Sequence, residues 1–299
     1  MTIPHKIAGL GELLWDIYDD RRHAGGAPAN FALHARRCGA DALLLSRVGN
    51  DQAGRDLKAL LARNGVDVSA IQTSPDKPTG SVRVHLGPAG APRFECSRDT
   101  AFDQLECDQV WRTLLPSLDA LLYGVLAQRE ETSRNAIRAC LHHADKALRL
   151  FDLNLRGWND STRDIVLNSL SMCDIVKMNE TELAILQQAL DAGKMDRQDF
   201  LLSLLHSYNI KMAAVTLGSR GCWLLTPDQN FRHPGFPVRA VDTTGCGDAF
   251  AAGLIWSILN KASLEEMAEF ANRLGAFVAT RQGAMPEWSQ DDLAALGEA

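Results

Sequence analysis

Apolar and polar positions follow one another along this chain with two periods, one typical of strands and one typical of helices. Short runs that are almost wholly apolar predict buried strands, and longer stretches with apolar residues three or four apart predict helices. The predicted strands span residues 7–14, 42–48, 120–123, 147–152, 174–177, 212–216 and 222–225. The predicted helices span residues 28–38, 54–64, 132–146, 161–171, 180–191, 198–208, 248–259, 264–280 and 290–297. This alternation predicts an α/β fold with a doubly wound, mainly parallel sheet.

The pattern changes between residues 81 and 97, where apolar and polar residues alternate. Residues 81–86 and 93–96 predict a hairpin with one solvated face, joined by a turn at residues 87–90. A lone hairpin is marginal in water, so we expect it to pair with residues 15–18 in a small separate sheet. Its apolar stripe is too narrow for a core and predicts a homodimer contact; the stripe consists of Val82, Val84, Leu86 and Phe94.

The segment from Gly245 to Asp248 is the strongest chemical signal in the chain. It precedes a helix that is apolar on every face, which predicts a central, buried helix. Backbone N–H groups of Gly245, Cys246 and Gly247 would lie at the positive end of this helix and could bind an anion. Asp248 beside that anion could accept a proton from a hydroxyl, or it could simply be the helix N-cap. The same helix end favours the thiolate of Cys246 and predicts reactivity toward thiol reagents, although Asp248 opposes it and the side chain could instead point into the core.

Polar side chains also follow two other predicted strands. Asp152, Asn154 and Arg156 end one of them, and Arg156 suits a phosphate or carboxylate or could pair with Asp152. Asn179 and Glu182 end the other, where their spacing favours a helix cap. An amide and a carboxylate at this edge of a parallel sheet could instead hold magnesium through water.

Composition excludes several classes of protein. The chain has 299 residues with a net charge of −6 and no basic run, so we expect no nucleic-acid partner. Its longest apolar run is too short to cross a bilayer and its start lacks a signal-peptide pattern, so we expect no membrane association. Seven cysteines without a C-x-x-C pair indicate reduced thiols and a cytoplasmic protein. A Walker-type loop, a protein-kinase motif set, a zinc cluster and a complete dinucleotide fingerprint are all absent from the sequence.

Five segments together resemble the ribokinase-like (PfkB) carbohydrate kinases, and the resemblance runs from about residue 7 to about residue 286. They are Gly25-Gly26-x-x-x-Asn30, Phe151-Asp152-x-Asn154-x-Arg156, Asn179-x-x-Glu182, Val215-Thr216-Leu217-Gly218-x-x-Gly221 and Asp242-Thr243-Thr244-Gly245-x-Gly247-Asp248. The last segment is highly specific, and Cys246 stands in it where the family commonly has alanine. The amino-acid sequences from Gly11 to Asp16 and from Ser46 to Asp51 are most similar to those of bacterial fructokinases.

The resemblance implies an ATP-dependent kinase that transfers the γ-phosphoryl group to a primary hydroxyl of a sugar. It implies a small β-sheet lid of residues 13–27 and 77–97 over a large domain of residues 1–12, 28–76 and 98–299. The implied catalytic residues are Asp248 as the base and Gly245, Cys246 and Gly247 as the anion hole. The implied sugar ligands are Asp16, Gly26, Asn30, Asp152, Asn154 and Arg156. The implied nucleotide ligands are Thr216, Gly218, Gly221 and Asn272. Asn179 and Glu182 would organise Mg²⁺, and Asp242, Thr244 and Gly283 a monovalent cation such as K⁺.

Fructose is the first substrate that this resemblance implies, with 2-keto-3-deoxygluconate next. A ribokinase, or a kinase of nucleosides or sugar phosphates, is a weaker alternative, because no extra basic cluster offers a second phosphate site. A catalytically silent sugar-binding protein on the same fold is a third hypothesis, and the intact Asp248 and its glycines oppose it.

Overall fold

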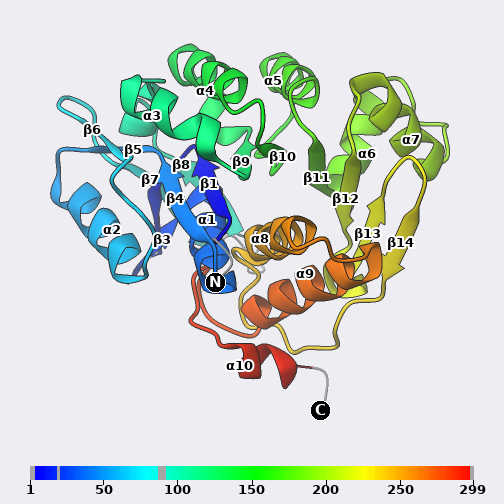
Figure 1. Ribbon diagram of the computed structural model, residues 1–299. Helices are drawn as coiled ribbons and strands as arrows, with labels where there is room; N and C mark the ends of the chain where they lie inside the picture. The colour runs from blue at the N-terminus through cyan, green and yellow to red at the C-terminus, as the bar shows by residue number, and fades with distance from the viewer. Residues whose placement is uncertain (1–3, 19–20, 87–91, 297–299) are drawn as a thin grey trace.

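A computed structural model describes residues 4–18, 21–86 and 92–296 of the chain (Figure 1). Its main sheet has eight strands in the order β14-β13-β12-β11-β10-β9-β1-β4. The strands are β1 Lys6–Leu10, β4 Asp41–Leu45, β9 Ala120–Gly124, β10 Leu148–Asp152, β11 Ile175–Asn179, β12 Met212–Thr216, β13 Cys222–Leu225 and β14 Asn230–His233. The neighbouring pairs from β4 to β12 are parallel, whereas the pairs β12–β13 and β13–β14 at the other edge are antiparallel. The predicted mainly parallel α/β sheet is therefore confirmed.

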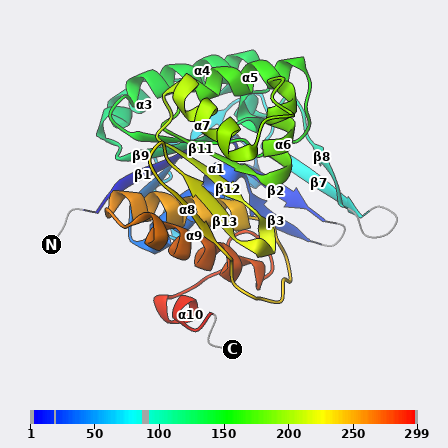
Figure 2. The same cartoon turned by 90° about the vertical axis from the view of Figure 1, so that its right-hand side faces the viewer.

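Helices cover both faces of this sheet (Figures 1 and 2). One face carries α3 Gln109–Leu114, α4 Glu131–His143, α5 Asp160–Leu170, α6 Glu180–Ala189 and α7 Arg197–Tyr208. The other carries α1 Ala27–Cys38, α8 Cys246–Leu259 and α9 Leu264–Ala279. The helices α2 Gln52–Arg63 and α10 Gln290–Ala294 lie at the periphery. Short 3₁₀ helices span Ala101–Gln104, Leu115–Ser117, Leu126–Gln128 and Gly218–Arg220.

Local signals in the sequence set several helix ends. Pro28 lies in the first turn of α1, and Gly39 ends that helix with φ 108°, a conformation that glycine adopts readily. Ser263 and Glu266 form the predicted capping box at the start of α9. In α8, Ala249, Phe250 and their neighbours are buried as predicted, since both α1 and α9 pack against it.

A second, four-stranded sheet has the order β3-β2-β7-β8. Its strands are β2 Leu14–Ile17, β3 Arg22–Gly25, β7 Gly80–Leu86 and β8 Pro92–Cys96. The hairpin β7–β8 pairs with β2 as predicted, in parallel register through β7. Residues 87–90, the predicted turn, lie outside the described residues, and so do the side chains of Val84, Leu86 and Phe94.

The stripe proposed for a dimer contact is not intact on the surface. Val82 is only 6% exposed and packs against Leu14 and Phe102 of its own chain. Its side chain is therefore unavailable for a partner subunit. The homodimer itself stays a prediction.

Two predicted strands were wrong in extent and three strands were missed, for identifiable reasons. The predicted strand 7–14 ends at Leu10, because Gly11 takes φ 146° and turns the chain toward β2. The predicted strand 42–48 divides into β4 and β5 Arg47–Gly49, and β5 pairs with β6 Gln72–Ser74. The strands β3, β6 and β14 were missed because their sequences are largely polar. No helix among the described residues is long and apolar enough to span a membrane.

Candidate active site

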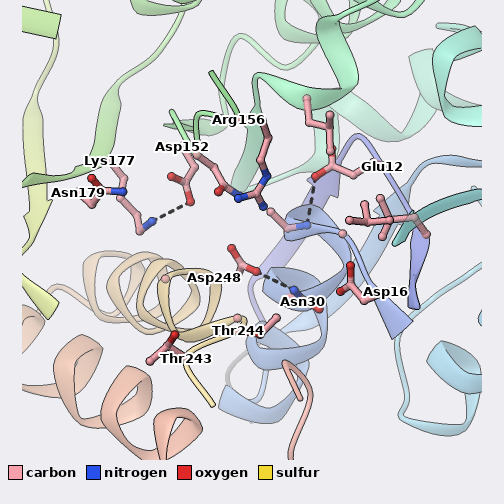
Figure 3. Close-up of a pocket in the computed structure, with 18 of the residues that line it drawn as sticks. Glu12, Asp16, Asn30, Asp152, Arg156, Lys177, Asn179, Thr243, Thr244 and Asp248 are labelled. Atoms are coloured by element: carbon pink, nitrogen blue, oxygen red, sulfur yellow. Dashed lines mark hydrogen bonds and ion pairs between the residues drawn. The ribbon is translucent and has the colours of Figure 1, made fainter. Parts of the chain in front are cut away.

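A cavity of about 360 Å³ opens where the main sheet meets the small sheet. The strands β10, β11 and β12 end at it, β2 and β7 contribute from the small sheet, and the start of α8 closes its floor (Figure 3). Its polar lining includes Glu12, Asp16, Asn30, Asp152, Asn154, Arg156, Lys177, Asn179, Glu182, Thr216, Thr244 and Asp248. The carboxyl end of a parallel sheet is where open α/β folds bind their ligands.

Asp248 lies in the first turn of α8 and is 8% exposed. Its Oδ2 accepts a hydrogen bond of 2.7 Å from Nδ2 of Asn30, which α1 carries (Figure 3). Burial, followed by the charge of Asp152, raises the pKa of Asp248 to about 7. The N-cap interpretation of Asp248 is wrong, because Gly245 occupies that position. A buried carboxyl group with a pKa near neutrality is suited to accepting a proton.

The glycine turn, which consists of Gly245, Cys246 and Gly247, differs in detail from the predicted anion site. The helix α8 begins at Cys246, two residues earlier than predicted. The N–H of Cys246 donates to Thr243 O at 3.3 Å and that of Asp248 to Gly245 O at 3.1 Å. Of the three N–H groups predicted to bind an anion, that of Cys246 is therefore engaged within the turn. Gly245 and Gly247 are the remaining donors.

The expectation of a thiolate at Cys246 is wrong. Burial first, and then the charges of Asp248 and Asp242, raise the pKa of this thiol to about 12. Its Sγ lies 3.9 Å from Asp242 O and the residue is half-buried. Desolvation and two nearby carboxylates therefore outweigh the helix dipole at this position.

Lys177 is a site residue that the sequence analysis missed. Its Nζ donates to Asp152 Oδ2 at 2.8 Å, and both side chains are almost fully buried. A Cβ placed on Gly247 would lie only 3.2 Å from the same Nζ, so the ammonium group is next to the glycine turn. Asp152 thus forms an ion pair with Lys177. A lysine within the otherwise apolar strand β11 was the signal that could have identified it.

Asn179 and Glu182 form the capping box that their spacing predicts. Asn179 Oδ1 accepts from the N–H of Glu182, and Glu182 Oε2 accepts from the N–H of Asn179. The other oxygen of Glu182 accepts from Leu155 N–H at 2.7 Å. Both carboxylate oxygens are thus anchored, and the pair faces the cavity beside Lys177. Among the described residues, no group of three or more His, Cys, Asp or Glu side chains is placed to hold a metal directly.

The end of the cavity beneath the small sheet is rich in carboxyl groups. Asp16 lies on β2, and burial raises its pKa to about 6. Gly26 has φ 107°, and a Cβ there would lie 2.4 Å from Glu12 O, so only glycine fits. Glu12, which the sequence analysis did not single out, is 4% exposed, and its Oε1 accepts from Ala27 N–H at 3.2 Å. Its Oε2 has no hydrogen-bond partner, and burial raises the pKa of Glu12 to about 7.

A second cavity of about 410 Å³ lies on the other side of the glycine turn, between β12, α8 and α9. Thr216, Gly218, Gly221 and Asn272, the four residues predicted for the nucleotide, all line it. Its other walls are largely apolar and include Phe236, Val238, Ala240, Phe250 and Ala276. The two cavities share Thr216, Thr243 and Gly247. A molecule that filled the second cavity could therefore reach the first beside Asp248.

Asp242, Thr244 and Gly283 come together as predicted for a cation loop. The Oδ1 of Asp242 accepts from Thr244 N–H at 2.9 Å and its Oδ2 from Gly283 N–H at 3.0 Å. Burial opposes ionisation of Asp242, but these hydrogen bonds prevail and lower its pKa. The carboxylate therefore joins two loops that are 41 residues apart.

Comparison with known proteins gives a consistent result. The family model described as pfkB family carbohydrate kinase matches residues 10–291. Fructokinase-1 of Zea mays is 33% identical over 276 residues, covering 88% of this chain and 84% of its own length. A putative sugar kinase of Pyrococcus horikoshii is 30% identical over 314 residues, covering 98% and 96%. The crystal structure of a Vibrio cholerae fructokinase with fructose, ADP and calcium bound matches with a TM-score of 0.84 at 27% identity, covering 99% of both chains.

The chain belongs to the pfkB family of carbohydrate kinases and has the ribokinase-like fold. It is an ATP-dependent phosphotransferase that acts on a sugar.

Proposed function

We propose that this kinase is a fructokinase that transfers the γ-phosphoryl group of ATP to a primary hydroxyl of fructose. The observation that carries the proposal is the position of Asp248. Its carboxyl group lines the polar cavity at the start of α8, directly after Gly247, which the polar cavity shares with the largely apolar one, and it is held by Asn30. A silent sugar-binding protein would have no need of a buried base there.

In the proposed reaction, the sugar hydroxyl gives its proton to the Asp248 carboxylate as its oxygen bonds to the γ-phosphorus. The bond between that phosphorus and the β,γ-bridging oxygen breaks, and ADP leaves. The N–H groups of Gly245 and Gly247 would donate to the transferring group, and Lys177, which lies next to Gly247, would add a positive charge. Such a reaction depends more on positioning and charge stabilisation than on a strong base.

Asn179 and Glu182 suit an indirect role toward Mg²⁺. Because both oxygens of Glu182 already accept backbone hydrogen bonds, the pair fits water molecules of a hydrated ion better than the ion itself. Magnesium, when bound, would neutralise charge on the phosphate groups. A monovalent cation at the Asp242 loop would use backbone carbonyls, since the oxygens of that carboxylate accept from Thr244 and Gly283. The small sheet would act as a lid that closes over the sugar and excludes water.

The carboxyl groups at the end of the polar cavity beneath the small sheet favour an uncharged sugar as the substrate. Glu12, Asp16 and Asp248 line it together with the single arginine Arg156. Hydroxyl groups can donate to these carboxyl oxygens, whereas a carboxylate or second phosphate on the substrate would be repelled. This ranks fructose above 2-keto-3-deoxygluconate and above sugar phosphates. Fructokinase names among the relatives point the same way.

A coupled ADP-release assay tests the proposal with fructose, ribose, 2-keto-3-deoxygluconate, fructose 6-phosphate and adenosine. We expect fructose to give the highest kcat/KM by at least about tenfold, the discrimination that one or two well-placed hydrogen bonds provide. A higher kcat/KM with 2-keto-3-deoxygluconate than with fructose would make that acid the substrate and contradict the fructokinase proposal. Turnover of none of the five compounds would contradict the proposed substrate class.

A further inference from the structure

A buried histidine on α1 connects the loop between α9 and α10 to the glycine turn. His34 has no exposed surface and lies four residues after Asn30, so the two side chains leave the same face of α1. Asn30 binds Asp248, while His34 binds the loop residue Ala284. This loop runs beside α1 in Figure 1. One helix face therefore holds both the base and the loop that borders the turn.

The two hydrogen bonds of His34 define its tautomer. Trp288 Nε1 lies 3.1 Å from His34 Nδ1, and an indole N–H can only donate. The Nδ1 atom must therefore be the acceptor, and Nε2 carries the proton. That Nε2–H donates to Ala284 O at 2.9 Å. The ring thus acts as a fixed bridge between Trp288 and Ala284.

Ala284 is the residue on which the glycine turn rests. A Cβ placed on Gly245 would lie 2.5 Å from the Cβ of Ala284 and 2.9 Å from its carbonyl oxygen. On the other side of this contact, Gly283 N–H binds Asp242. The loop that contains Gly283 and Ala284 is thus held against the glycine turn by Asp242 on one side and by His34 on the other.

We propose that His34 is a positioning residue that sets the glycine turn relative to Asp248. The inference rests on the proposed kinase function. Through Asn30 and His34, α1 would hold the proton acceptor and the anion-binding N–H groups in one rigid arrangement. Those N–H groups act on charge that develops in the transition state, so a displaced turn lowers kcat more than it raises KM.

Two substitutions separate the two bonds of the ring. In His34→Gln, the amide nitrogen can replace Nε2 and donate to Ala284 O, while the bond to Trp288 is lost. In His34→Asn, the amide oxygen can replace Nδ1 and accept from Trp288, while the bond to Ala284 is lost. Leu33→Val is the matched control. Leu33 is also fully buried on α1, but it packs into the hydrophobic cluster that contains Leu13 and Leu44.

We expect His34→Asn to lower kcat at least about tenfold with both KM values within about threefold, since displacement of a reacting group by about 1 Å can cost about 10²-fold. His34→Gln should keep kcat within about threefold of wild type, rescuing the reaction through Ala284. Leu33→Val should lower Tm and leave kcat unchanged. Equal kcat in both His34 variants and the wild type, or an equal loss in both, would overturn the proposal.

A second readout does not depend on activity. The ¹⁵N shifts of the His34 imidazole should report the Nε2–H tautomer in the wild type. In Trp288→Phe the Nε2–H tautomer should persist, because the Ala284 carbonyl can only accept, and only the Nδ1 signal should shift as its hydrogen bond is lost. A Nδ1–H tautomer in the wild type would overturn the assignment even if the enzyme proved to phosphorylate no sugar.

Discussion

Single residues show how burial tunes the site. Glu12, Asp16 and Asp248 are all desolvated, and burial is the largest cause of the raised pKa in each. Lys177 is also buried, but Asp152 pairs with it and keeps it charged. The site thus holds an ionised pair beside carboxyl groups that exchange protons near neutral pH.

Replacing Asp248 by Asn should lower kcat by about 10²–10⁴, the usual contribution of general-base assistance. The amide is nearly isosteric and can still accept from Asn30, so the sugar and ATP affinities should remain close to those of the wild type. In the wild type, kcat/KM should fall as pH falls through about 7, because the base is then protonated. Steady-state kinetics between pH 5.5 and 8.5 measure both effects.

The control is Asp145→Asn, the same change on an exposed residue of the chain. It should leave kcat and the pH profile unchanged. Turnover of Asp248→Asn within a few-fold of wild type would mean that Asp248 is not the proton acceptor.

Two half-buried thiols should differ in reactivity. The hydrogen bond with Cys140 is the largest cause that lowers the pKa of Cys107, whereas burial raises that of Cys246. At pH 7.5, iodoacetamide should therefore modify Cys107 first and Cys246 only slowly. Mass spectrometry of tryptic peptides over time gives the two rates. Cys107→Ser should remove the fast phase, and faster labelling of Cys246 that ATP prevents would reverse this assignment.

Elements with short-range signals were predictable from the sequence. The capping boxes of α6 and α9 were identified correctly because their spacing is local. The pairing of the hairpin with β2 was also predicted, but its parallel register was not, because this contact joins residues more than 60 positions apart and depends on where Gly11 turns the chain. The start of α8 was misplaced because Gly245, which propensity places outside a helix, takes φ 77° and acts as its N-cap.

Asp51 connects the helix α2 to the small sheet. Its side chain caps α2 through Gly54 N–H and also accepts from the backbone N–H and the hydroxyl of Thr79, just before β7. Asp51→Ala should cost about 0.5–2 kcal/mol of the free energy of unfolding, the usual value of an N-cap. Because β7 carries part of the proposed lid, the KM for sugar should rise while that for ATP stays constant.

Asp196→Ala is the control, because Asp196 caps α7 on the main sheet. It should cost a similar free energy of unfolding and leave both KM values unchanged. Equal effects of the two variants on sugar KM would show that the Asp51 contact does not act through the small sheet.

At the scale of the whole molecule, contacts between residues far apart in the sequence explain which site residues could not be predicted. Motif segments that end at the same sheet edge, such as those of Asp152 and Asn179, were placed together because parallel strands share that edge. Lys177 and Glu12 belong to no polar cluster in the sequence, and their roles depend on three-dimensional neighbours. His34 likewise gains its partners from residues about 250 positions away.

The homodimer predicted from the small sheet is a property of the whole molecule. With Val82 packed inside its own chain, any such contact would use other residues of this sheet. We expect light scattering at micromolar concentration to give the mass of two chains. A mass equal to one chain of 32.7 kDa would contradict the homodimer.

The stability of the protein should carry a pH signature of its buried base. The pKa of Asp248 is about 7 in the folded protein and 3.8 for an ordinary aspartate, so between these values only the folded protein retains the proton. The stability linked to this group is full below about pH 4 and is lost as pH rises through about 7. Asp248→Asn should therefore raise Tm at pH 8, and its advantage over wild type should shrink toward pH 5. Calorimetry at pH 5, 6, 7 and 8 measures the difference.

Asp174→Asn should behave in the opposite way. Although burial opposes its ionisation, bonds from Arg149 and Lys211 prevail and lower the pKa of Asp174. Its contribution to stability is present above the ordinary pKa of 3.8 and is lost only as pH falls below it, so the variant should melt lower than wild type throughout this range. If Asp248→Asn also melted lower than wild type at pH 8, the carboxylate would be stabilised in the fold. A base held ready by burial would then be ruled out.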